Sequence, residues 1–113
     1  MHEFGVTENI VTIALDKARE ARASKIGKIN LVVGELSGFV PECIKFYFDF
    51  LSKDSITEGA SLNFEVAPAK FRCRDCSAVF NPQSAPWVCP QCQSQSVEIT
   101  GGRELYVKSM EVE

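Results

Sequence analysis

The sequence predicts an α+β fold in which two helices pack on a three-stranded sheet, with a zinc-ribbon-like domain of four cysteines inserted before the last strand. Three observations predict it. Two segments carry apolar residues at helical spacing, three shorter segments alternate between apolar and polar residues, and a cysteine-rich stretch interrupts this order. A chain of 113 residues is long enough for one compact domain with such an insert.

The first helix is expected over residues 3–23, where charged residues separate apolar ones that recur at helical steps. The apolar set is Val6, Ile10, Ile13, Ala14, Ala18 and Ala21. Residues 28–34 then alternate around Ile29, Leu31 and Val33, which predicts a strand. Its high apolar content favours a central position in the sheet.

The second helix is expected to begin at Pro41, because proline suits the first helical position. The following run is rich in aromatic residues and has strand propensity. Helical spacing of Ile44, Phe48 and Leu51 nevertheless favours a helix, and further aromatic residues beside this stripe predict that it is mostly buried.

Alternation around Leu62, Phe64 and Val66 predicts a half-buried strand, and the last strand is expected over residues 103–112. Between them the chain is rich in Cys, Pro, Gln and Ser and poor in core residues. We therefore expect residues 1–68 together with 98–113 to form the α+β domain, and residues 69–97 to form the inserted domain.

Four of the five cysteines form two CxxC pairs separated by twelve residues: Cys73, Cys76, Cys89 and Cys92. Two such loops can place four thiolates around one tetrahedral ion, which is the geometry that Zn²⁺ favours. A closed set of four protein ligands predicts a structural site. Two disulfides, unrelated core thiols and a rubredoxin-type iron centre remain as alternatives. The fifth cysteine, Cys43, is interpreted as a buried helical thiol.

The composition limits the classes of partner. A net charge of −3 argues against a general nucleic-acid binder, which needs a basic field. No apolar run is long enough to span a membrane, and the N-terminus lacks the pattern of a secretory signal, so a cytoplasmic location is expected. A small basic patch at Lys70, Arg72 and Arg74 leaves a nucleic-acid adaptor as an alternative.

The only histidine, His2, lies next to the N-terminus. A large residue at this position favours retention of Met1. The terminal amine, the backbone nitrogen of His2 and its imidazole can then form fused chelate rings around one ion. Nitrogen-rich planar sets suit Ni(II) or Cu(II), with the backbone nitrogen of Glu3 or water as a fourth donor. An incomplete terminal site can load and unload its ion, which is the property of a carrier. The alternative is a frayed chain end.

Together these features resemble the HypA/HybF family, the nickel metallochaperones for maturation of [NiFe] hydrogenase. The resemblance covers essentially the whole chain. The residues that carry it are Met1-His2-Glu3, Val32-Val33-Gly34-Glu35-Leu36, Phe71-Arg72-Cys73 and the second CxxC pair.

The resemblance implies a nickel-binding domain that contains His2 and a zinc-binding domain formed by the insert. His2 and the backbone nitrogen of Glu3 would hold Ni²⁺, with the amine of Met1 as a further donor, and Glu3 would also help to dock a partner. The implied partners are a HypB-type GTPase and the hydrogenase large subunit, and some relatives also serve urease. Neither nucleic acid nor a membrane is implied.

No catalytic set is visible, and the phosphate-binding GxxxxGK[ST] motif does not occur, so a non-enzymatic role is expected. A rubredoxin-like electron carrier is the weaker alternative. Pro68 and Gly101-Gly102 flank the insert and would permit strand exchange, so a monomer or a weak or strand-exchanged dimer is expected.

Overall fold

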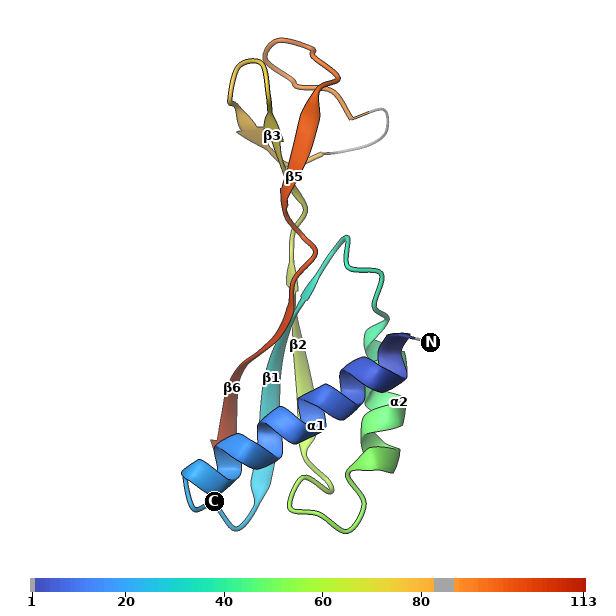
Figure 1. Cartoon of the computed structure of the whole chain (residues 1–113), viewed down its shortest axis with the longest axis vertical. Helices are drawn as coiled ribbons and strands as arrows, with labels where there is room; N and C mark the ends of the chain where they lie inside the picture. Colours follow the sequence, from blue (N-terminus) through green and yellow to red (C-terminus); the bar gives the residue numbers. More distant parts are fainter. Residues whose placement is uncertain (1, 83–86) are drawn as a thin grey trace. The chain divides into compact units, whose positions relative to one another are not determined.

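The computed structural model describes residues 2–82 and 87–113, with nothing stated of the side chain of His2 (Figure 1). Its elements are α1 (His2–Glu20), β1 (Ile26–Gly34), α2 (Pro41–Leu51), β2 (Ser61–Ala67), β3 (Lys70–Cys73), β4 (Val79–Phe80), β5 (Val97–Gly101) and β6 (Leu105–Val112). Two compact units contain them. Unit 1 comprises Met1–Val33, Phe39–Glu65 and Leu105–Glu113, and unit 2 comprises Gly34–Gly38 and Val66–Glu104.

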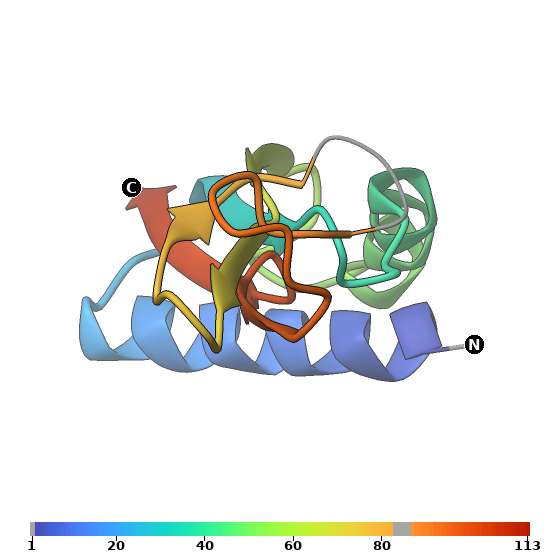
Figure 2. The same ribbon diagram turned by 90° about the horizontal axis from the view of Figure 1, so that it is seen from above.

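Unit 1 holds a three-stranded sheet in the order β2-β1-β6, with β1 and β6 antiparallel. Helix α1 lies across the sheet, and α2 lies beside the N-terminal half of α1 (Figures 1 and 2). The core is formed by one stripe of α1, the inward face of β1 and one stripe of α2; its larger members are Ile10, Val11, Ile26, Ile29, Leu31, Ile44 and Phe48. The predicted α+β arrangement of two helices and a three-stranded sheet is confirmed.

Helix α1 ends at Glu20, three residues before the predicted end. Arg22 adopts a left-handed conformation with φ of 56°. The N–H of Ala23 donates to the carbonyl of Ala18 at 2.9 Å, and that of Arg22 donates to Arg19 at 3.1 Å. This is the Schellman arrangement, in which a left-handed residue ends a helix while its last carbonyls remain hydrogen-bonded.

Helix α2 begins at Pro41 as predicted, but the prediction that it is mostly buried is wrong. Ile44 and Phe48 are buried, whereas Phe46 is 70% exposed and Phe50 is 62% exposed. The core covers only one stripe of a helix, and these two phenylalanines lie beside that stripe. The burial of α2 predicted from its aromatic residues was therefore too high.

Unit 2 contains a second sheet that the sequence did not predict, in the order β4-β3-β5 with both pairings antiparallel. The short segment 34–38 joins this unit through the backbone. The N–H of Gly34 donates to the carbonyl of Glu104 at 2.6 Å, and that of Leu36 donates to Gly102, also at 2.6 Å. The carboxylate of Glu35 accepts the N–H of Ala69 at 2.8 Å.

None of the helices in the described part of the chain is both long enough and apolar enough to cross a bilayer.

Candidate metal centre

The first CxxC pair lies in a tight loop at the end of β3. The N–H of Ser77 donates to the carbonyl of Cys73 at 2.9 Å, and the N–H of Cys73 donates to the carbonyl of Ala78, also at 2.9 Å. Ser77 is left-handed, with φ of 66°. These two bonds close the loop and turn both thiols of the pair to one side. We call this loop, residues 73–78, the first knuckle.

The second pair repeats this geometry in residues 89–94, the second knuckle. The N–H of Gln93 donates to the carbonyl of Cys89 at 2.8 Å, and the N–H of Cys89 donates to the carbonyl of Ser94 at 2.9 Å. Gln93 is left-handed, with φ of 62°. The two knuckles are therefore equivalent in both hydrogen bonds and in the position of the left-handed residue.

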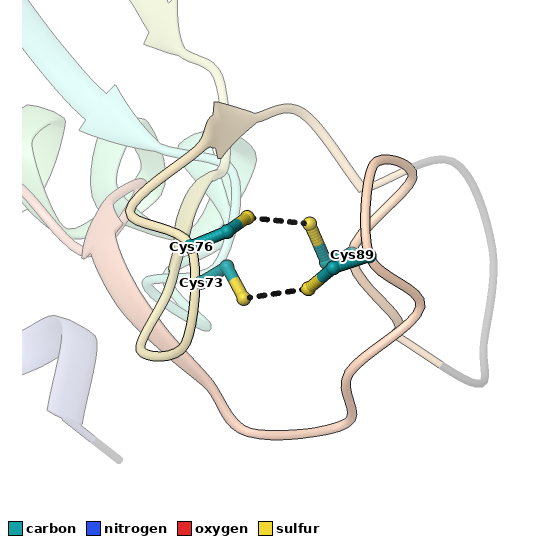
Figure 3. Close-up of side chains that lie close together, drawn as sticks. Cys73, Cys76 and Cys89 are labelled. Atoms are coloured by element: carbon teal, nitrogen blue, oxygen red, sulfur yellow. Dashed lines mark hydrogen bonds between the residues drawn. The ribbon is translucent and has the colours of Figure 1, made fainter.

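The two knuckles face each other with their sulfurs together (Figure 3). Cys73 Sγ lies 3.5 Å from Cys92 Sγ, and Cys76 Sγ lies 3.5 Å from Cys89 Sγ. All four sulfurs lie within 4.8 Å of one another, and they form the one such potential metal-binding group among the described residues. A tetrahedral ion bound at about 2.3 Å would separate its sulfurs by about 3.8 Å. The four-cysteine cluster therefore fits a zinc site.

The backbone prepares the first thiol of each knuckle for ionisation. The N–H of Cys92, followed by that of Gln91, hydrogen-bonds to the sulfur of Cys89 and lowers its pKa to about 7. In the first knuckle, the N–H of Cys76 and then that of Asp75 lower the pKa of Cys73 in the same way. These N–H groups favour the thiolate, which is the form that binds a metal.

The second thiol of each knuckle behaves in the opposite way. The N–H of Ser94 favours the thiolate of Cys92. The hydrogen bond between the thiols of Cys92 and Cys73, together with the loss of hydration, nevertheless raises the pKa of Cys92 to about 12. The N–H of Ala78 acts likewise on Cys76, and the contact with Cys89 raises the pKa of Cys76 overall. Without a bound cation, four clustered thiols resist ionising together, because neighbouring thiolates repel one another.

We expect metal binding at this cluster to release at least two protons per ion at pH 8. Raised pKa values keep Cys76 and Cys92 protonated at that pH, and both must become thiolates to bind. Affinity for Zn²⁺ should therefore rise about a hundredfold per pH unit near pH 8. Calorimetry in buffers of different ionisation enthalpy measures the number of protons released per bound ion. Release of fewer than two protons would contradict the protonated state assigned to Cys76 and Cys92.

Three aromatic side chains pack together beside the knuckles. Phe71 is buried in β3, with its ring 5.9 Å from that of Phe80 and 4.7 Å from that of Trp87. Their mutual packing gives unit 2 its small apolar core.

Two of the three basic residues predicted to form a patch beside the cysteines share one carboxylate. Arg72 Nε donates to Glu98 Oε2 at 2.6 Å, and Arg74 Nε lies 3.6 Å from the other oxygen of the same carboxylate. The carboxylate of Glu98 offsets one of the two arginine charges and so reduces the positive charge that the patch presents to a phosphate. This pairing weighs against the nucleic-acid adaptor that the sequence left open.

The predicted nickel ligands fall at the edge of the described chain. Met1 and the side chain of His2 lie outside the described residues, while the backbone of His2 begins α1. The carboxylate of Glu3 accepts the N–H of Val40 at 3.3 Å, and the hydroxyl of Thr7 donates to the carbonyl of Glu3 at 2.5 Å. The N–H of Glu3 itself and that of Val40 lower the pKa of the Glu3 carboxyl.

The interpretation of Cys43 as a buried thiol is wrong, because its side chain is exposed on α2. It comes directly before Ile44, on the side of α2 that the core does not cover. The four clustered sulfurs do not include that of Cys43.

Comparison with known proteins shows the family of this chain. The sequence model of the family described as "Hydrogenase/urease nickel incorporation, metallochaperone, hypA" matches residues 1–112. The chain belongs to the HypA family. Among curated relatives, the hydrogenase maturation factor HypA of Dehalococcoides mccartyi strain 195 is 43% identical over 113 residues, which cover 100% of this chain and 95% of the relative. That of Caldanaerobacter subterraneus subsp. tengcongensis is 40% identical, with both chains covered completely.

Solved HypA structures agree with the fold. A solution structure of a HypA protein matches 99% of this chain and 96% of its own, with a TM-score of 0.79 and 29% identity. The nickel metallochaperone HypA of Helicobacter pylori matches 97% of this chain and 96% of its own, with a TM-score of 0.70 and 27% identity. The resemblance to this family found in the sequence is confirmed.

Proposed function

We propose that this chain binds Ni²⁺ through Met1, His2 and Glu3 and delivers it for maturation of the [NiFe] hydrogenase large subunit. The ligands would be the terminal amine, the imidazole and backbone nitrogen of His2, and the backbone nitrogen of Glu3. Membership of a nickel-incorporation family carries this proposal. The four clustered cysteines suit a closed structural site, and His2 is the only histidine in the chain.

The chelate would form at the start of α1, where the first N–H groups have no acceptor among the carbonyls of the helix. The N–H of Glu3 hydrogen-bonds to its own carboxylate, so nickel bound through that nitrogen would replace this hydrogen bond. The bond from Val40 to the Glu3 carboxylate ties residue 3 to the start of α2. Backbone nitrogens bind Ni²⁺ only after they lose a proton, so uptake would strengthen as pH rises.

The cysteine cluster would hold Zn²⁺ and maintain unit 2. Four thiolates in a reduced state suit a protein that works in the cytoplasm. The proposed partners are a HypB-type GTPase, with Glu3 contributing to its docking, and the hydrogenase large subunit. Because the family description includes urease, delivery to that enzyme is a second candidate destination. The role is that of a carrier without catalysis of its own.

Substitution of His2 with alanine should abolish stoichiometric nickel binding and leave zinc content and helicity unchanged. The imidazole closes the chelate, so its loss leaves only the amine and backbone donors. Metal analysis after nickel loading measures the nickel and zinc bound per chain. The protein must be untagged, because an N-terminal tag would block the amine. Glu8→Ala is the matched control, since Glu8 is an exposed residue on α1.

The control should bind nickel like the wild type. Equal nickel uptake by the wild type and His2→Ala would disprove the proposed site and leave the cysteine cluster assignment intact. Loss of zinc together with nickel would show instead that the substitution damages the fold.

A further inference from the structure

The equivalence of the two knuckles exposes one feature that they do not share. Ser94 in the second knuckle corresponds to Ala78 in the first, and Asp75 in the first corresponds to Gln91 in the second. Ser94 Oγ donates to Asp75 Oδ2 at 2.5 Å, which links the two knuckles directly. The reciprocal bond cannot form, because Ala78 carries no hydroxyl.

Both partners of this bond are themselves held by the backbone. The N–H of Ser96 donates to Ser94 Oγ at 3.0 Å, so that the hydroxyl proton is directed elsewhere. The N–H of Asp75 donates to Cys73 Sγ at 3.4 Å, and the carbonyl of Ser96 accepts the N–H of Arg74 at 2.9 Å. A carboxylate acceptor makes the Ser94–Asp75 bond a charge-assisted one.

The second knuckle needs such a link more than the first. The first knuckle continues from β3, which pairs with both β4 and β5. In contrast, the described residues 87–96 belong to no strand or helix, so the second knuckle lies within a loop. An ion bound by both knuckles would therefore be lost most readily by movement of the second knuckle away from the first.

We propose that Asp75 and Ser94 are positioning residues that hold the second knuckle against the first and so slow the loss of Zn²⁺ from the cysteine cluster. Neither side chain is a ligand. The hydrogen bond between them keeps the two knuckles opposite each other when one metal–sulfur bond breaks. The broken metal–sulfur bond can then form again before the ion leaves. Interactions behind the ligands of a metal site commonly change affinity by about 10–100-fold.

The test is the rate at which the zinc-loaded full chain releases Zn²⁺ to an excess of a coloured chelator. Ser94→Ala and Asp75→Ala should each accelerate release about tenfold. Ser94→Thr keeps the hydroxyl and should restore a rate near that of the wild type. The double variant should be no faster than either single one, because both remove the same bond.

Gln91→Ala is the matched control, since Gln91 holds the position in the second knuckle equivalent to that of Asp75, and its release rate should not change. Cobalt(II)-loaded Ser94→Ala should keep the absorption spectrum of a tetrahedral four-sulfur site. The proposal would be overturned if Ser94→Ala released Zn²⁺ at the wild-type rate, or if Ser94→Thr failed to restore that rate. It would also be overturned if Gln91→Ala accelerated release as much as Ser94→Ala, or if Ser94→Ala bound less than one zinc at saturation. Nickel binding at the N-terminus is a separate readout and should be unaffected.

Discussion

Cys73→Ser should unfold unit 2 and leave unit 1 folded. The apolar core of unit 2 is small, and two of its fully buried residues, Cys73 and Cys89, are themselves cluster cysteines. Binding of a structural zinc ion contributes about 10–16 kcal/mol of apparent free energy in small zinc domains. Loss of one ligand therefore removes more than a unit of this size can supply by apolar burial.

Two optical signals separate the units. Trp87 is the only tryptophan and packs against Phe71 in unit 2, so its fluorescence reports that unit. Both helices lie in unit 1, so helical circular dichroism reports the other. We expect the Trp87 signal of Cys73→Ser to match that of denatured protein while helicity persists. Cys43→Ser, at the cysteine outside the cluster, should change neither signal. A native Trp87 signal in Cys73→Ser would contradict the structural role of the cluster.

Gly34→Ala should destabilise unit 2 by about 3 kcal/mol or more, which is the upper range for overpacking. A Cβ at Gly34 would lie 2.2 Å from the carbonyl oxygen of Gly102 and 2.7 Å from the nitrogen of Arg103. Both are backbone atoms, so no side-chain rotation can relieve the clash. The hydrogen bond from Gly34 to Glu104 would be strained with it.

Urea unfolding followed by Trp87 fluorescence measures this effect. Gly27→Ala is the matched control in the same strand, because its Cβ would meet nothing nearer than the carbonyl oxygen of Glu111 at 3.8 Å. The control should change the midpoint little. A midpoint for Gly34→Ala equal to that of the control would show that residues 34–38 do not join unit 2 as described.

The features predicted from the sequence are those with a local signal. Helical spacing and Pro41 located α2, alternation located β1 and β2, and the two CxxC pairs located the cluster. Strands β3, β4 and β5 escaped prediction because they are two to five residues long, too short for alternation to be recognised.

Other features depend on partners far apart in the chain. Gly34 meets Gly102, and Asp75 meets Ser94, so neither contact leaves a periodic pattern in the sequence. The exposure of Phe46 is likewise a property of tertiary packing, since propensity alone cannot tell which stripe of α2 the core covers. The left-handed conformations of Ser77 and Gln93 could have been predicted from the sequence, because each residue directly follows a CxxC pair.

In the proposed function the two metals bind to different atoms: nickel to nitrogen donors at the start of the chain, and zinc to the four sulfurs. X-ray absorption at the nickel and zinc edges of one doubly loaded, untagged sample tests this directly. We expect nickel with only nitrogen and oxygen neighbours in a planar set, and zinc with four sulfurs at about 2.3 Å. Sulfur bound directly to nickel, or zinc displaced from its sulfurs by nickel, would contradict the account.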